Sequence, residues 1–269
     1  MVEKDGIIIK DGQVILNSGE KLSIENLREE ASRIRFISNQ HFKDTSIRIL
    51  ESSRVIFENC IFENVVFKNC DFREIGFKNH TVIRNGTFKS CNLNGTFFYD
   101  SHILSSTFLS CQMKRPFLEN VSEMRDCLFK KCRMNDIYFP LPEFQYNKIV
   151  GKLSECTFGS KTNKVEKLYA DLSEAHLSFV EFTRCDLTET IRPVDPDILY
   201  IKNLGERSKK AQEKIATIQD DRKRRALSIY TESWINEKYV DYLMSRKDYK
   251  WAWDDYFEDV SRCLGLEWK

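Results

Sequence analysis

Nine cysteines and four histidines are the residues in this 269-residue chain whose types could do chemistry. Cysteines in such number can form disulfides, and cysteines or histidines at short spacings can bind zinc. The sequence contains no His-x-x-x-His or His-Cys pair, no Gly-x-Ser-x-Gly turn, no phosphate-binding glycine-rich loop and no dinucleotide fingerprint. We therefore predict no catalytic residue, no metal site and no cofactor. The histidines are His41, His80, His102 and His176.

Eight of the nine cysteines stand two residues before a large apolar residue. Cys127 and Cys132 are five residues apart, which is not the spacing of a zinc knuckle. A buried free cysteine behaves as a small hydrophobic residue, and reduced thiols fit the cytoplasm. We therefore predict eight reduced core cysteines and no disulfide. They are Cys60, Cys70, Cys91, Cys111, Cys127, Cys132, Cys156 and Cys185.

The cysteines follow an internal repeat of five residues. A phenylalanine falls on every fifth residue from Phe57 to Phe77, and a smaller apolar residue lies two positions before each one. This period is neither the 3.6 residues of a helix nor the 2.0 residues of a strand. A fixed internal period outranks local propensity as evidence, because each period is one structural unit.

A stack of rectangular coils explains this period. If each unit forms one side of a coil, its central residue and the residue two before it point inward. Successive coils then hydrogen-bond at strand spacing, about 4.8 Å, and no coil can bury its core alone. On a helix, residues five apart do not stay on one face. In a flat strand, successive residues at this spacing point to opposite faces of the sheet. The sequence therefore predicts a β-solenoid.

Four consecutive units late in the chain carry a family resemblance. They are Ala170-Asp-Leu172-Ser-Glu, Ala175-His-Leu177-Ser-Phe, Val180-Glu-Phe182-Thr-Arg and Cys185-Asp-Leu187-Thr-Glu. These units resemble the pentapeptide-repeat proteins, whose repeats read roughly Ala-(Asp/Asn)-(Leu/Phe)-x-x. The resemblance implies a right-handed, four-sided parallel β-helix, so the fold class is mainly β with a C-terminal α-helical module. The predicted central core residues are Phe57, Phe62, Phe67, Phe72, Phe77, Phe88, Phe98, Phe108, Phe129, Phe139, Phe158, Leu172, Leu177, Phe182 and Leu187.

The chain divides into three expected parts. Residues 1–33 form an N-terminal lead-in that caps the first coil, with a hairpin signal at Asp11-Gly12 and a short helix from Ser23. Residues 34–190 form the β-helix, in which His80 takes the inward place before Val82. Excursions from its wall are expected near 140–150 and 159–168, where the pattern lapses. Residues 191–269 form the helical module, with helical patterns at 211–229, 235–243 and 253–264.

Aromatic residues are the candidates for partner binding. The run at residues 249–257 is dense enough for an interface anchor, since Trp and Tyr are favoured hot-spot residues. Alternatively, this run forms the module's own core and docks it over the last coil. Excursions on a regular scaffold are where binding residues tend to lie, although they can also be tolerated loops without function. The candidates are Trp234, Tyr249, Trp251, Trp253, Phe144 and Tyr146.

Charge and hydropathy argue against several classes of function. The net charge is +1, from 42 basic and 41 acidic residues, and residues 51–190 carry 18 of each. This balance argues against direct nucleic-acid binding and against an acidic mimic of DNA, as some pentapeptide-repeat proteins are. No apolar run approaches the roughly 18 residues of a membrane span. The start is too short and polar for a secretory signal, so we expect a cytoplasmic protein.

We expect a non-enzymatic scaffold for protein–protein interaction that shields or neutralises a partner protein, as an immunity protein does for a toxin. One alternative is a DNA-mimicking protector of a topoisomerase. Another is a bacterial effector with the tail as its targeting piece. A homodimer through the C-terminal helices is a further expectation.

Overall fold

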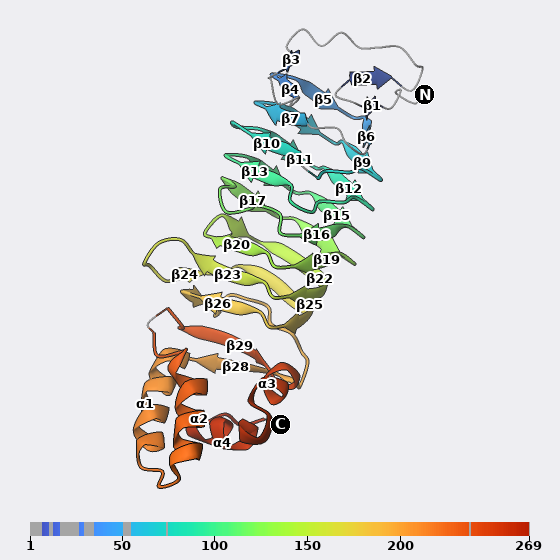
Figure 1. Cartoon of the computed structure of the whole chain (residues 1–269). Helices are drawn as coiled ribbons and strands as arrows, with labels where there is room; N and C mark the ends of the chain where they lie inside the picture. Colours follow the sequence, from blue (N-terminus) through green and yellow to red (C-terminus); the bar gives the residue numbers. More distant parts are fainter. Residues whose placement is uncertain are drawn as a thin grey trace.

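The computed structural model shows a rod of stacked coils that ends in a helical module (Figure 1). It describes residues 7–10, 13–16, 27–29, 35–50, 55–73, 75–236 and 238–268. The rod is a β-solenoid of about seven turns with parallel sheets, and the chain is mostly β. The predicted β-solenoid with a C-terminal helical region is therefore confirmed.

The rod has four inward columns, one on each side of the coil. The first follows β4 (Arg35–Ser38), β7 (Val55–Glu58), β10 (Gly76–Lys78), β13 (Phe97–Tyr99), β20 (Tyr138–Leu141), β23 (Thr157–Ser160) and β26 (Glu181–Thr183). The second follows β5 (His41–Lys43), β8 (Ile61–Glu63), β11 (Val82–Arg84), β14 (His102–Leu104), β17 (Glu123–Arg125) and β21 (Phe144–Gln145), with β24 (Glu166–Lys167) and β27 (Cys185–Asp186) beyond.

The third column follows β6 (Ser46–Ile49), β9 (Val66–Lys68), β12 (Thr87–Lys89), β15 (Thr107–Leu109), β18 (Leu128–Lys130), β22 (Asn147–Ser154) and β25 (Ala170–Ser178). The fourth includes β16 (Gln112–Lys114), β19 (Arg133–Asn135) and the later halves of β22 and β25. Neighbouring strands pair in parallel with central residues in register, as Phe67, Phe88 and Phe108 do. This register places each central side chain above the one in the preceding coil.

Phenylalanine rings stack along these columns. Phe88 lies between Phe67 and Phe108, with 4.7 Å between ring centroids on either side and nearly parallel planes. Phe77 stacks in the same way between Phe57 and Phe98, at 5.2 Å from each. Each of the predicted core residues is buried, the eight cysteines included. Rings within one column are thus spaced as the strands are, because each coil contributes one ring to that column.

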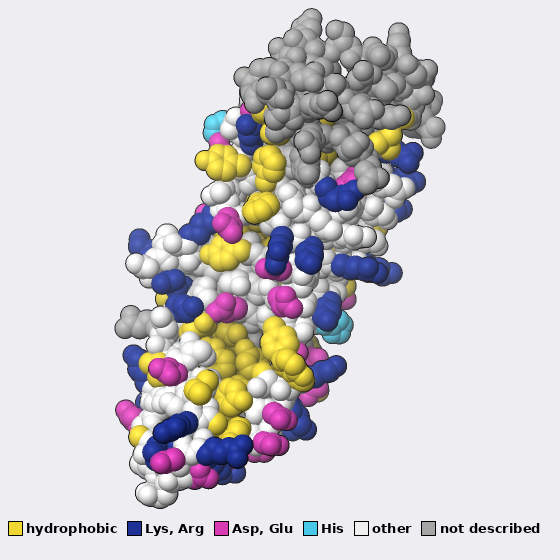
Figure 2. Space-filling model, in the orientation of Figure 1, with side chains coloured by type: hydrophobic (Ala, Val, Ile, Leu, Met, Phe, Trp, Pro, Cys, Tyr) yellow, Lys and Arg dark blue, Asp and Glu magenta, His cyan; other side chains and the backbone are white. Residues whose placement is uncertain are grey.

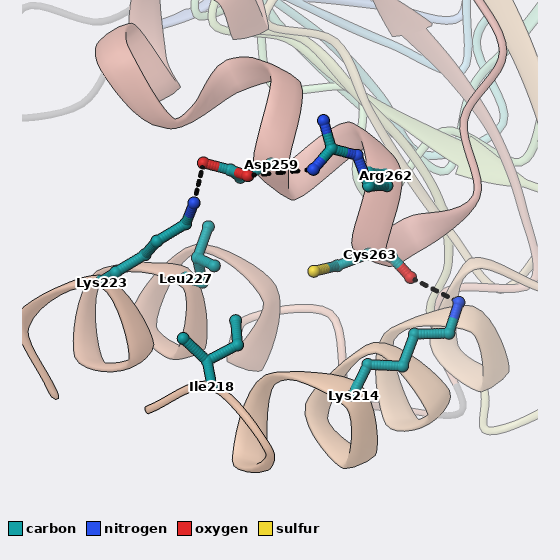
Figure 3. A pocket seen from close by; sticks show the side chains of 7 residues that line it. All are labelled: Lys214, Ile218, Lys223, Leu227, Asp259, Arg262 and Cys263. Carbon is teal, nitrogen blue, oxygen red and sulfur yellow. Dashed lines mark hydrogen bonds and ion pairs between the residues drawn. The ribbon is translucent and has the colours of Figure 1, made fainter. Parts of the chain in front are cut away.

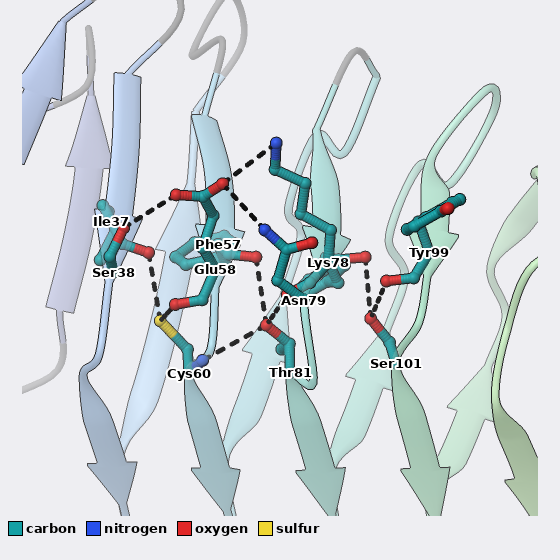
Figure 4. Close-up of polar contacts among 11 residues, drawn as sticks. Ile37, Ser38, Phe57, Glu58, Cys60, Lys78, Asn79, Thr81, Tyr99 and Ser101 are labelled. Atoms are coloured by element: carbon teal, nitrogen blue, oxygen red, sulfur yellow. Dashed lines mark hydrogen bonds and ion pairs between the residues drawn. The ribbon is translucent and has the colours of Figure 1, made fainter.

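Where the small inward residue before a central residue is Cys, Ser or Thr, its side chain bonds to the preceding coil (Figure 4). The Cys60 thiol donates to the carbonyl oxygen of Ile37 at 3.2 Å, and the Ser101 hydroxyl donates to that of Phe77 at 2.8 Å. Thr81 does the same with Phe57, at 3.1 Å. Burial raises the pKa of the Cys60 thiol to about 11, so it keeps its proton and remains a donor. The column also accepts apolar side chains such as Val65 and Ile75, so the donors add hydrogen bonds where they occur but are not required at every coil.

At most corners the residue two after the central residue has a positive φ. Asn59 and Asn64 have φ values of 49° and 55°. Asn and Asp tolerate this left-handed conformation better than other side chains. Their amides also form ladders, since Asn64 Nδ2 donates to Asp44 Oδ1 at 2.8 Å and Asn85 Nδ2 donates to Asn64 Oδ1 at 3.2 Å. Backbone geometry and side-chain ladders thus both favour Asn and Asp at corners.

We expect Asn64→Val to lower the free energy of unfolding by about 2 kcal/mol, because a β-branched residue is disfavoured at positive φ. Urea unfolding of the purified chain measures this change. Asn64→Gly is the matched control, since glycine accepts the backbone angle and loses only the exposed amide bonds. A glycine variant as unstable as the valine variant would show that the ladder, and not the backbone, sets the cost.

The register differs from the prediction at His80. The side chain of His80 is exposed, Thr81 takes the inward place and Ile83 is the central residue. One extra residue lies at this corner, where both Asn79 and His80 have positive φ. The expectation that His80 precedes an inward Val82 is therefore wrong, because the inserted residue is absorbed before the strand begins.

The excursion predicted near 140–150 is also wrong. The wall continues through β20, β21 and β22, and Phe144 is a central residue in register with Met124. Pro142 is exposed at the corner between β20 and β21, where its missing N–H interrupts no ladder. The second predicted excursion, near 159–168, contains an exposed loop at residues 161–165, between β23 and β24.

The N-terminal hairpin is confirmed. β1 (Ile7–Lys10) pairs antiparallel with β2 (Gln13–Leu16), and β1 also extends the rod by pairing with β6. Most of the helix expected from Ser23 lies outside the described residues. Within it, β3 (Leu27–Glu29) is a strand that pairs with β4, so the helix prediction is wrong there. The open edge of the first coil offers backbone partners that favour a strand.

The C-terminal module combines helices with a two-stranded ribbon. β28 (Ile198–Lys202) pairs antiparallel with β29 (Asp241–Ser245), and the ribbon lies beside β26 at the end of the rod (Figure 1). The helix expected at 235–243 is therefore wrong, because Tyr242 and Leu243 belong to β29. The helices are α1 (Leu204–Ala216), α2 (Asp221–Glu232), α3 (Arg246–Trp253), the 3-10 turn η1 (Asp254–Tyr256) and α4 (Phe257–Leu264).

Candidate functional site

The module is fastened to the last coils by buried polar contacts. Asp241 is buried, and its Oδ2 accepts from the backbone N–H of Leu187 at 3.1 Å and from the Tyr200 hydroxyl at 2.9 Å. The Tyr239 hydroxyl donates to Glu181 Oε1 at 2.6 Å. Burial and the Asp241 carboxylate raise the pKa of Tyr200 to about 12, so the hydroxyl remains a donor. The Leu187–Asp241 and Tyr239–Glu181 bonds join rod and module, and Tyr200 holds Asp241 in place from within the module.

Two candidate binding residues lie inside the module. Trp253 and Trp234 are buried, with ring centroids 5.8 Å apart, and Trp253 also packs on Tyr249 and Phe257. Their assignment to partner binding is therefore wrong, because their rings form the module's own core. The same correction holds for Phe144, which is fully buried against Phe139 at 4.7 Å.

Trp251 is instead 77% exposed and lies beside the rod. Its ring meets that of Phe179 edge-on, with 5.8 Å between centroids, and the Phe179 ring is 6.5 Å from that of Tyr249. We call these three residues the junction patch. Asp248 of α3 fixes its geometry, because the carboxylate accepts from the Phe179 backbone N–H at 2.9 Å. Figure 2 shows hydrophobic side chains gathered at the level where the rod meets the helices.

Phe179 occupies a corner with φ of 49°, where this rod otherwise favours Asn, Asp and Ser. Bulky residues are outliers at positive φ, and the side chain is 39% exposed, so core burial does not compensate fully. Tyr146 is the other aromatic corner residue among those described, with φ of 56° and 56% exposure. Phe179 was not among the predicted binding residues, although the period places it two residues after the central Leu177.

Tyr146 borders a groove of about 710 Å³ between β21 and β24, which we call the β21–β24 groove. The Tyr146 ring stacks on that of Tyr169 at 5.2 Å, and the Arg125 guanidinium lies 5.8 Å from the centre of the Tyr146 ring. Glu143, Gln145 and Lys167 also line the groove. Its walls therefore combine aromatic surface with charges of both signs.

A smaller pocket of about 370 Å³ lies among α1, α2 and α4 (Figure 3). Its floor is apolar, at Ile218, Leu227 and the half-buried Cys263. Asp259 pairs with Lys223 at 2.7 Å, so the main charges at its rim partner each other. Burial raises the pKa of Cys263, which keeps the thiol protonated and weakly nucleophilic. This arrangement is that of packed helices with a shallow depression.

Within the described ranges, no group of three or more His, Cys, Asp or Glu side chains could hold a metal ion. In that part of the chain, no helix is both long and apolar enough to cross a membrane. On the face shown in Figure 2, basic and acidic side chains are interspersed.

No protein-family model and no curated protein sequence matches the chain. Solved structures similar to it include a trypsin-treated variant of QnrB1, a plasmid-mediated fluoroquinolone resistance protein (12% identity, TM-score 0.34, 60% of this chain and 84% of that one). Another is HetL, a pentapeptide repeat protein involved in heterocyst differentiation regulation from the cyanobacterium Nostoc sp. strain PCC 7120 (10% identity, TM-score 0.20, 59% and 87%). A third is the pentapeptide repeat protein Rfr23 from the cyanobacterium Cyanothece 51142 (6%, 0.19, 58% and 90%).

The chain's own geometry decides the fold. A buried central residue recurs at intervals of mostly five residues, and these residues form four columns with parallel strands in register. The chain has the pentapeptide-repeat fold. In a pentapeptide-repeat rod each coil contacts only its neighbours, so the outward residues are free to vary without disturbing the core. Single exposed aromatic residues such as Tyr99 are ordinary on such a wall, so what distinguishes Phe179 and Trp251 is their mutual contact and the positive φ of Phe179.

Proposed function

We propose that this pentapeptide-repeat protein is a non-enzymatic scaffold that binds another protein through the junction patch. The observation that carries the proposal is the exposed, edge-on pair of Phe179 and Trp251. Phe179 is held at positive φ, which costs about 1–2 kcal/mol relative to a residue suited to that backbone. Unfavourable backbone geometry that persists on a surface suggests a function for the side chain concerned.

The patch is suited to recognition because it is already rigid. The backbone of Phe179 belongs to the solenoid wall, and Asp248 binds it from α3, so little freedom is lost when a partner binds. Exposed Trp beside Phe and Tyr also matches the composition of interface hot spots. These features support a contact with a folded protein surface.

We further propose that binding shields or neutralises the partner, in the manner of an immunity protein. A rod of about seven stacked coils presents flat walls beside the patch, and such walls could cover the partner's own working surface. The nine free cysteines, eight of them buried, support a cytoplasmic location where thiols remain reduced. Within this proposal the protein needs neither cofactor nor metal.

We expect Trp251→Ala to weaken partner binding by about thirtyfold, the effect of losing a hot spot of roughly 2 kcal/mol. The measurement is quantitative capture of proteins from a native extract by the tagged full chain and by the variant. Tyr99→Ala is the matched control, because Tyr99 is exposed on β13 at a distance along the rod. Retention of the same proteins by wild type and Trp251→Ala would contradict the proposal.

The same capture experiment decides between the alternatives. A topoisomerase subunit retained by the chain would favour the protector function, and a host protein would favour an effector. The interspersed charges in Figure 2 give the DNA-mimicking alternative no support on that face. A light-scattering mass of the purified chain tests the expected homodimer through the C-terminal helices.

A further inference from the structure

The β21–β24 groove exists because the solenoid wall is interrupted on one side. The central residues Phe139 and Phe144 are five residues apart, whereas Phe158 and Leu168 in the next coil are ten apart. The extra length forms the exposed loop 161–165. In the described part of the chain, β21 pairs with β17 and β24 pairs with β27, but β21 and β24 are not paired with each other. The inserted unit before β24 therefore leaves β21 and β24 without strand pairing between them.

Two buried acceptors in this opening lack donors. Gln145 is only 9% exposed, and its Nε2 donates to the Lys167 carbonyl oxygen at 3.4 Å. That contact fixes the orientation of the amide, and Gln145 Oε1 is left without a hydrogen-bond partner. Glu143 Oε2 is likewise buried and without a partner. Buried polar atoms are normally paired, so two unpaired acceptors in one groove call for a donor, which is either ordered water or a ligand that donates hydrogen bonds.

The charges of the groove favour a cationic donor. Three carboxylates line it, at Glu123, Glu143 and Glu166, against two cations, at Arg125 and Lys167. Arg125 is already paired with Glu123, with 3.0 Å between its Nε and Glu123 Oε1. The remaining negative charge lies on Glu143, where the unpaired oxygen is, and on Glu166.

Lys167 is engaged outside the groove lining, since its Nζ lies 3.4 Å from Glu189 Oε1. The stacked rings of Tyr146 and Tyr169 add a surface on which a planar cation can lie. The Arg125 guanidinium already lies over the Tyr146 ring, so a second cation would lie on the Tyr169 ring of the pair. A guanidinium also presents several N–H donors in a fixed fork, which suits two separate acceptors.

We propose that the β21–β24 groove binds a basic side chain of a partner protein, with the guanidinium of an arginine as the best fit. This inference rests on the proposed function, because it assigns a second contact to the same class of partner. Gln145 and Glu143 accept the N–H groups, and the tyrosine pair supports the plane of the cation. The junction patch would then supply apolar contact, and the groove would supply charge recognition.

The test uses the full chain and a small probe, Nα-acetyl-arginine amide, followed by NMR of the Gln145 side-chain amide and the Tyr146 backbone amide. We expect both signals to shift on titration. The isosteric but uncharged Nα-acetyl-citrulline amide should bind about tenfold more weakly, as should arginine amide to Glu143→Gln. Glu155→Gln, an exposed corner residue away from the groove, should leave binding unchanged.

Equal binding of the arginine and citrulline probes would overturn the inference, as would preferential binding of inorganic phosphate at Arg125 and Lys167. Circular dichroism of Glu143→Gln tests whether the variant is folded. The titration of wild type with the two probes does not depend on that variant. If partner capture depends on Trp251 but the arginine probe does not bind, the groove inference alone fails. If the probe binds but no partner is captured, the proposed function fails and the guanidinium site stands.

Discussion

Phe88→Ala is expected to lower the free energy of unfolding by about 4 kcal/mol, within the range measured for removal of a fully buried phenylalanine. Phe88 is fully buried, and its ring is stacked between those of Phe67 and Phe108. Its removal opens a cavity in mid-rod and also breaks three ring contacts, because the ring meets that of Phe72 as well. The coils above and below are held by their own ladders, so the cavity cannot collapse easily. Denaturant unfolding followed by circular dichroism measures the loss.

Tyr99→Ala is the control, because the Tyr99 side chain is exposed on the outer wall and such substitutions usually change stability by about 0.5 kcal/mol or less. A similar small change for Phe88→Ala would mean that the columns are loosely packed. That result would contradict the account of a core built from stacked rings in register.

Asp241→Ala is expected to cost about 3 kcal/mol and to loosen the helical module from the rod. The substitution removes the acceptor of both the Leu187 N–H and the Tyr200 hydroxyl, leaving two donors unpaired next to the last coil. Hydrogen bonds to a charged acceptor contribute about 1.5–3 kcal/mol each, and the Leu187 N–H is buried whereas the Tyr200 hydroxyl is only part-buried. Unfolding measurements combined with limited proteolysis near residues 191–197 report stability and docking separately.

Two milder variants show how the loss of stability divides between the two hydrogen bonds of Asp241. Tyr200→Phe removes one donor with its hydrogen bond and should cost about 1 kcal/mol, while Asp241→Asn keeps one acceptor oxygen and should fall between. If Asp241→Ala were no more damaging than Tyr200→Phe, the buried carboxylate would not be the fastening point. The module would then be held chiefly by ring contacts such as that between Tyr242 and Phe182.

The five-residue period predicted most of the rod because it reports directly on side-chain direction. Every coil repeats the same geometry, so one clean stretch from Phe57 to Phe77 defines the columns for the rest. Insertions are harder to place, since the period shows that a residue has been added but not which corner absorbs it. At His80 the extra residue joined the corner, and at 161–165 a whole extra unit became a loop. Near Pro142, where the five-residue pattern is weak, the structure has an ordinary coil.

The module was harder to predict, because contacts with the rod override local pattern there. The aromatic spacing of Tyr239, Tyr242 and Leu243 fits a helix face, but pairing with β28 turns the segment from Asp241 into a strand. Likewise, Trp251 and Trp253 are two residues apart on α3 and so point in different directions, one outward and one into the core. The sequence shows that both are aromatic, and only the docking of α3 decides which is exposed.

The groove was beyond sequence reasoning for a related reason. Tyr146 was a candidate because it lay in a supposed excursion, yet it stands at a corner of an ordinary coil. What makes its surroundings unusual is the loss of pairing between β21 and β24, which depends on the insertion in the next coil. The unpaired oxygens of Gln145 and Glu143 follow from that gap and leave no trace in the repeat.

The most direct test of the central claim is Phe179→Asn, measured for stability and for partner capture in the same preparation. Asparagine suits the positive φ and should recover about 1 kcal/mol, while loss of the edge-on contact with Trp251 costs about 0.5–1.5 kcal/mol. We predict an unfolding free energy within about 1 kcal/mol of wild type and partner binding at least about tenfold weaker. A variant that captures the partner as wild type does would contradict the claim that the junction patch is the binding surface.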